Sequence, residues 1–158
     1  SAVGAGAFVS EIFGDEADEL RRRGGDGGEF GATTGRPRRC GWLDLVTLKY
    51  AKRLNGLTGL SVNHLDTIGK FDTIKVCTGY DVNGEVTEDF TTNLNVLNNA
   101  KPVYKELKGG WDESIADCKT FDELPEDAKA YINFIEEYIG VPVKFIGTGA
   151  EREAMIVR

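Results

Sequence analysis

Residues 125–149 constrain the fold of this chain more than any other segment. Apolar side chains recur there at the spacing of one helix face: Ala128, Tyr131, Ile132, Ile135, Tyr138 and Ile139. Pro125 suits the first helical position, and Gly140 with Pro142 ends the helix. Residues 141–146 are β-branched and aromatic, which predicts a strand leading directly into the glycine turn that follows. The segment therefore predicts a helix, a strand and a glycine loop in this order.

Other elements are predicted from periodicity and turn residues. Residues 10–23 and 42–54 are typical of helices, because acidic residues come early in each and basic residues late. Asn83-Gly84 predicts a two-residue hairpin. Alternation of apolar and polar residues predicts strands or extended segments at residues 58–62, 74–80, 86–90 and 101–111. Residues 91–99 are rich in asparagine and predict an irregular connection.

Composition excludes several classes of protein. With 158 residues, 41% hydrophobic and 28% charged, the chain has the profile of one soluble globular domain. A net charge of -7 opposes a general nucleic-acid surface.

Three cysteines that are far apart, Cys40, Cys77 and Cys118, fit neither a disulfide framework nor a CxxC metal site. Without an apolar run of membrane-spanning length or a basic leader, we expect a cytoplasmic protein that binds no membrane.

Residues 31–42, GATTGRPRRCGW, have the composition of an anion-binding loop. Thr33 and Thr34 offer hydroxyl and backbone donors, and Gly35 permits a tight turn. Planar guanidinium groups suited to carboxylate or phosphate come from Arg36, Arg38 and Arg39. The loop precedes the predicted helix 42–54, whose N-terminus would also attract negative charge. This chemistry predicts an anion but leaves its identity open.

The same string resembles the adenylosuccinate synthetase family, and three further segments match in the order of the family. VGAGAF at residues 3–8 is similar to VGxGPF, NHLD at 63–66 to TKLD, and GTGAER at 147–152 to the closing xxGPxR. The resemblance implies the C-terminal portion of the P-loop-like α/β fold of that family, with helices packed on short strands and at least one antiparallel hairpin. It implies one domain, with a substrate-loop region at 1–41 and a guanine-recognition region at 42–158.

Enzymes of this family use GTP to join IMP to L-aspartate through a phosphorylated IMP intermediate. They keep the phosphate loop, the Mg²⁺ ligands and the catalytic aspartate and histidine near their N-terminus, and no GxxxxGK[ST]-like or GDEGKGK-like string occurs here. The resemblance therefore implies GTP as a co-substrate, and no catalytic or metal-binding residue in this chain. It also implies that the chain is inactive without the missing N-terminal portion, and that the full enzyme is a homodimer.

The resemblance assigns the aspartate and IMP contacts to the N-terminal third of the chain. The residues expected to close over aspartate are Ala32, Thr33, Thr34, Gly35, Arg36, Pro37 and Arg38. Bidentate hydrogen bonds from arginine would anchor the two substrate carboxylates and aim the amine. Arg36 would also reach the IMP ribose, while Val3 and Gly4 would line the IMP pocket. Ala2 stands where the family has arginine.

The resemblance assigns the GTP contacts to Arg38, His64, Leu65, Asp66, Gly147, Thr148 and Gly149. A carboxylate at Asp66 can accept from both the ring N–H and the exocyclic amine of guanine, whereas adenine presents the opposite pattern at its ring nitrogen. Asp66 would thus select GTP over ATP. His64 stands where lysine is common, and Ala150 where proline is usual. No cluster of partners gives His64, the only histidine, a catalytic or metal role.

Two other functions remain open from the residues alone. The chain would also suit a non-catalytic module that binds a guanine nucleotide or a dicarboxylate, which the alanines at positions 2 and 150 favour. RNA binding through residues 36–39 is opposed by the net charge and by the placement of the aromatic residues.

Overall fold

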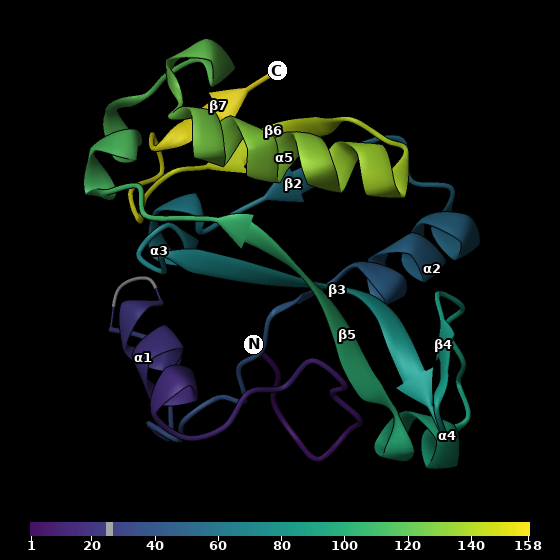
Figure 1. Cartoon of the computed structure of the whole chain (residues 1–158). Helices are drawn as coiled ribbons and strands as arrows, with labels where there is room; N and C mark the ends of the chain where they lie inside the picture. The colour runs from purple at the N-terminus through teal and green to yellow at the C-terminus, as the bar shows by residue number, and fades with distance from the viewer. Residues whose placement is uncertain (25–26) are drawn as a thin grey trace. The chain divides into compact units, whose positions relative to one another are not determined.

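The computed structural model describes residues 1–24 and 27–158 and divides into two compact units (Figure 1). The first unit comprises Ser1–Tyr50 and Lys75–Lys105, and the second comprises Ala51–Ile74 and Glu106–Arg158. The chain therefore passes between the units within helix α2 (Leu45–Asn55) and strands β3 (Thr73–Val82) and β5 (Lys101–Lys108). The regional boundary expected between residues 41 and 42 lies inside the first unit.

The first unit is built around strand β3. Its other elements are α1 (Asp15–Arg23), β1 (Leu43–Asp44), β4 (Glu85–Thr87) and α4 (Leu94–Asn99), with the first part of α2. Strand β1 pairs with β3 in parallel, β4 pairs with it antiparallel, and β5 also pairs with it. The predicted hairpin is confirmed: Asn83 and Gly84 have φ angles of 54° and 88°, as a two-residue hairpin requires. The buried core comprises Val46, Cys77, Tyr80 and Leu97.

The second unit contains a three-stranded sheet that is covered by one long helix. Strand β2 (Leu60–Val62) runs parallel to β6 (Val143–Gly147), and β7 (Met155–Val157) returns antiparallel to β6. Helix α5 (Glu126–Ile139) lies along this sheet in Figure 1. The predicted apolar stripe is buried, apart from half-buried Tyr138, and Gly140 ends the helix with φ 79°. The shorter elements are α3 (Leu65–Ile68) and the 3-10 turns η1 (Glu113–Asp117) and η2 (Phe121–Glu123).

Tertiary contacts shorten two of the predicted helices. Helix α1 begins at Asp15 and not at residue 10, because the chain before it pairs with residues 40–42: Ile12 N donates to Cys40 O at 3.0 Å, and Ser10 Oγ to Trp42 O at 2.7 Å. Helix α2 begins at Leu45, since the two preceding residues form β1.

The prediction of an irregular connection at residues 91–99 is wrong. Those residues contain α4, which the Asn93 side chain caps by accepting from Asn95 N at 3.0 Å. Asparagine therefore marks the start of a helix here. Every helix in the described ranges is too short or too polar to cross a bilayer.

Candidate functional site

The arginine loop, residues 31–39, is a closed turn held by backbone hydrogen bonds. Gly31 N donates to Arg36 O at 2.8 Å, and Gly35 N donates back to Gly31 O at 2.8 Å. Phe30 and Pro37 form an antiparallel bridge below the turn. Gly35 has φ 65°, a conformation that disfavours other residues. All four residues of 32–35 are exposed, although the Gly35 amide is used within the turn and Thr34 Oγ1 accepts from Arg36 N at 3.4 Å.

The three arginines of the loop have different surroundings. Arg36 is exposed, and its guanidinium group has no hydrogen bond or ion pair with the described residues. Arg38 is half-buried, and its Nη1 donates to Glu29 Oε2 at 3.2 Å. The Nε of Arg38 is buried and has no partner among the described residues. Arg36 is thus free to bind an anion, whereas Arg38 shares its charge with Glu29.

Arg39 is a structural residue and does not present an anion-binding fork. Its Nε and Nη2 bind the carboxylate of Glu11 at 2.9 and 2.7 Å, and its Nη1 donates to the carbonyls of Gly4 and Gly6 at 2.9 and 2.6 Å. The guanidinium group also lies 5.6 Å from the centre of the Phe8 ring. The reading of Arg39 as an anion ligand is corrected here, because its donors are used to hold the N-terminal segment.

This clamp brings two predicted substrate segments together. Ala2 and Arg39 exchange backbone hydrogen bonds of 2.8 and 3.0 Å, so residues 2–6 lie against the end of the arginine loop. Val3 is 84% exposed and Gly4 has φ 95°, so this segment presents its surface to solvent. The expectation that the loop lies at the N-terminus of helix 42–54 is wrong. Residues 40–44 separate the loop from α2, and Asp44 Oδ1 accepts from Thr47 N at 3.1 Å at that helix end.

In the second unit, the ends of two parallel strands bring together the NHLD and GTG segments. Val62 pairs with Ile146, so residues 63–66 and 147–149 leave the same edge of the sheet. Because the resemblance assigns all of these seven residues except Asn63 to GTP, we call them the guanine corner. A Cβ atom at Gly147 would lie 2.9 Å from Asn63 Oδ1 and 3.2 Å from the Asn63 Cα atom, so the two segments approach closely here. Sequence spacing alone does not reveal that the two segments touch.

Two oxygens of the guanine corner are buried without a hydrogen-bond partner in the described part of the chain. They are Asp66 Oδ1 and Thr148 Oγ1. Thr148 is fully buried, and its backbone N donates to Ala154 O at 2.9 Å, which fixes the turn after β6. Burying an unpaired polar atom costs about 1–3 kcal/mol, so such atoms mark places where a ligand can supply the missing partner.

The other members of the guanine corner supply backbone geometry. His64 is exposed and has φ 62°, a left-handed conformation that turns the chain sharply from β2 into α3. Leu65 is fully buried beneath Asp66 and packs into the core. Gly149 lies against Ala154 and Ala116, where a Cβ atom would approach their methyl groups to 3.0 and 3.2 Å.

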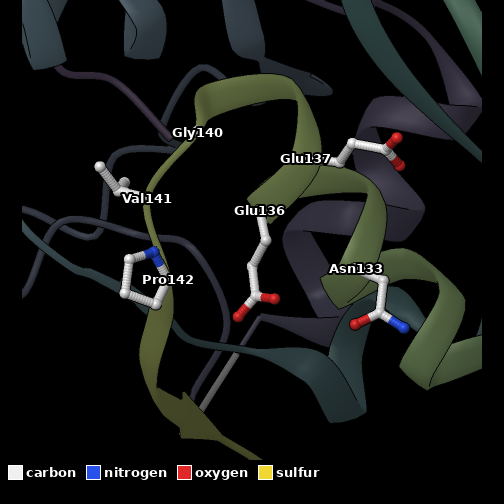
Figure 2. A pocket seen from close by; sticks show the side chains of 6 residues that line it. All are labelled: Asn133, Glu136, Glu137, Gly140, Val141 and Pro142. Carbon is white, nitrogen blue, oxygen red and sulfur yellow. The ribbon is translucent and has the colours of Figure 1, made fainter.

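A hollow of about 390 Å³ lies elsewhere in the second unit, at the end of α5. Figure 2 shows its lining, which comprises Asn133, Glu136, Glu137, Gly140, Val141 and Pro142. Glu136 accepts from Val143 N at 2.8 Å and pairs with Arg158, so its carboxylate is used to hold β6 and the end of the chain. None of the predicted site residues lines this hollow. Within residues 1–24 and 27–158, no group of three or more His, Cys, Asp or Glu side chains is arranged to hold a metal ion.

Comparison with known proteins identifies the family. The family model described as adenylosuccinate synthetase matches residues 1–156. The chain belongs to the adenylosuccinate synthetase family. The adenylosuccinate synthetase of Acetivibrio thermocellus is 53% identical over 157 residues, which cover 99% of this chain and 36% of that protein. The synthetase of Alkaliphilus metalliredigens is 49% identical over 156 residues, with the same two shares.

The fold agrees with a solved structure of this family. The structure of the fully ligated adenylosuccinate synthetase from Plasmodium falciparum matches with a TM-score of 0.89 and 38% identity, over 99% of this chain and 37% of that one. The predicted α/β class is therefore confirmed. This chain spans only about 36% of the length of the synthetases that it matches.

Proposed function

We propose that this chain supplies the aspartate loop and the guanine corner of an adenylosuccinate synthetase. The whole enzyme would use GTP to join IMP and L-aspartate into adenylosuccinate. The phosphate loop, the Mg²⁺ ligands and the catalytic acid and base would come from the remainder of the enzyme, so the chain would be inactive alone. Membership of the family supports this function.

The observation that carries the proposal is the pair of orphan oxygens in the guanine corner. Guanine presents a ring N–H and an exocyclic amine side by side, and both are donors that a carboxylate can accept. Asp66 Oδ1 is buried and has no protein donor among the described residues, so it is ready to accept from the base. Thr148 offers a second buried oxygen at the same sheet edge. Adenine would place an acceptor against the carboxylate, which disfavours ATP.

The arginine loop supports the aspartate half of the proposal. Residues 32–35 are exposed and carry two threonine hydroxyls that can donate, and the Arg36 guanidinium group beside them has no partner among the described residues. Charge-assisted bonds from these donors would hold the substrate carboxylates and orient the amine for attack. The Arg39 clamp would keep residues 3 and 4, which we assign to IMP, next to this loop.

A chimera tests the proposed function. In it, this chain replaces the matching segment of the Acetivibrio thermocellus synthetase, to which it is 53% identical. We expect the chimera to form adenylosuccinate from IMP, L-aspartate and GTP, and to lose this activity when any one of the three is omitted. The chain by itself should form none.

A second experiment separates the enzyme from a binding module. The chain is mixed with the separately produced remainder of the Acetivibrio thermocellus enzyme, and adenylosuccinate is measured. Restored activity supports the ligase function. A chain that binds GTP while neither the mixture nor the chimera makes product would instead be a guanine-nucleotide module, and would refute the proposal.

A further inference from the structure

Trp111 is joined to the guanine corner through a buried hydrogen bond. Its side chain is 5% exposed, and its Nε1 donates to Leu65 O at 2.7 Å. The same carbonyl accepts from Gly69 N at 3.2 Å, which is the backbone bond across α3. A carbonyl oxygen has two lone pairs, so both donors can be accommodated. Trp111 therefore does more than fill the core.

The position of Leu65 O determines the position of Asp66. The carbonyl of Leu65 and the N–H of Asp66 belong to one planar peptide group, so holding the carbonyl also sets the Cα atom of Asp66. Helix α3 has only four residues, and a helix this short is not stable by itself. Its N-cap residue, His64, makes no side-chain capping bond. An external donor is thus needed to fix this turn.

Close packing restricts the position of the Trp111 indole. A Cβ atom at Gly69 would lie 2.0 Å from Trp111 Nε1, so only glycine lets the ring approach α3. The Tyr131 ring lies 6.2 Å from the indole, centre to centre. An ion pair of 2.6 Å between Lys70 and Glu113 links the chain after α3 to η1, which begins two residues beyond the indole.

We propose that Trp111 is a positioning residue for guanine recognition. It acts through the Leu65-Asp66 peptide and holds Asp66 Oδ1 where the donors of the base can reach it. The indole itself does not contact the nucleotide in this account. The inference rests on the proposed function, since it assigns Trp111 a role at the same guanine corner.

The test replaces the indole N–H while keeping an aromatic ring. In the chimera, Trp111→Phe should raise the KM for GTP about tenfold, because the carboxylate loses its fixed place. The preference for GTP over ITP, whose base lacks the exocyclic amine, should fall by a similar factor. The kcat and the KM values for IMP and aspartate should stay within about twofold of the parent. Gly69→Ala should give the same pattern, because its methyl group displaces the indole.

The matched control is Tyr131→Phe, which removes a polar atom from the aromatic ring packed on Trp111 without touching α3. Its decrease in thermal midpoint should be no larger than that of Trp111→Phe, and its preference for GTP over ITP should equal that of the parent. A Trp111→Phe enzyme with parental preference, or one that loses activity equally with both nucleotides, overturns the inference while leaving the proposed function intact. A parent chimera that ligates without preferring GTP would instead contradict the proposed function, and the inference with it.

Discussion

The arginine loop and the guanine corner are both expected to bind anionic or polar ligands, yet they are built in opposite ways. The tip of the loop is exposed, it is held by its own backbone bonds, and the guanidinium group of Arg36 has no partner among the described residues. The corner is formed by the ends of two paired strands, and its oxygens are buried. One site keeps its binding groups in water, while the other has already removed them from water.

This difference predicts whether the free-energy cost of each site arises in the free protein or on binding. An exposed, solvated arginine does not destabilise the free protein. Binding aspartate must then order that side chain and displace its water, which lowers the net affinity. The buried oxygens of the corner destabilise the free protein, but a ligand that supplies donors regains that cost and is chosen by its donor pattern. We therefore expect mutations in the corner to change selectivity and stability together, and mutations in the loop to change affinity alone.

The largest effect should come from Asp66→Asn in the chimera. The amide presents both a donor and an acceptor to the base, so one of the two guanine contacts becomes repulsive while adenine gains a partner. The preference for GTP over ATP, measured as the ratio of kcat/KM values, should fall on the order of 100-fold.

Asp122→Asn provides the control for this change, since that exposed carboxylate lies in η2 of the same unit. It should leave the nucleotide preference as in the parent. Undiminished discrimination against ATP in Asp66→Asn would remove the selectivity role from the corner.

Arg36→Leu should have the next largest effect. Loss of the free guanidinium group removes a charge-assisted contact to a substrate carboxylate, and the KM for aspartate should rise at least about tenfold. The thermal midpoint should not change, because the side chain is exposed and has no partner among the described residues. Arg53→Leu is the matched control, because Arg53 in α2 is also exposed and has no side-chain ion pair with the described residues. An unchanged KM for aspartate, or a lower midpoint, would contradict the contrast between loop and corner.

How much of this contrast can be predicted from the sequence depends on the range of the contacts. The local signals of Asn83-Gly84 and of the stripe in α5 predict the right elements, because turn chemistry and helix periodicity are decided within a few residues. The family motifs name the candidate residues. The pairing of β2 with β6 is not readable from sequence, since it joins residues more than 80 positions apart.

The roles of Arg39 and Trp111 also depend on distant contacts. Arg39 looks like the other arginines of its loop until Glu11 and the carbonyls of Gly4 and Gly6 are placed around it. From the sequence alone Trp111 looks like a core residue, because the Leu65 carbonyl that accepts its N–H bond lies 46 positions away in the chain. Both residues fix backbone rather than ligand, and a motif comparison is least informative about such roles.

A smaller effect of mixed sign is expected for Thr148→Val. The valine methyl group replaces a buried hydroxyl that lacks a partner, so the nucleotide-free chimera should gain up to about 1 kcal/mol in unfolding free energy. The KM for GTP should nevertheless rise about fivefold, because the base or ribose loses a hydrogen bond. Thr148→Ser retains the hydroxyl and should keep the parental KM. If valine lowered both stability and affinity, the hydroxyl would be a packing group and the corner would not be preformed.

The smallest effect concerns the Arg39 clamp at the end of the arginine loop. Cys40 directly follows the Arg39 clamp and is 2% exposed, and burial raises the pKa of its thiol. Cys118, after η1, is only partly buried; desolvation, followed by the charges of Glu123 and Asp117, raises its pKa too. With both thiols protonated at pH 7.5, access decides the rate, and iodoacetamide should modify Cys118 at least about tenfold faster than Cys40 by peptide mass spectrometry. Arg39→Lys cannot keep the bidentate contact with Glu11, so it should reduce the ratio of the Cys118 modification rate to the Cys40 modification rate. Equal rates in the parent would mean that Cys40 is as accessible as Cys118, and that the clamp does not hold the N-terminal segment against the loop.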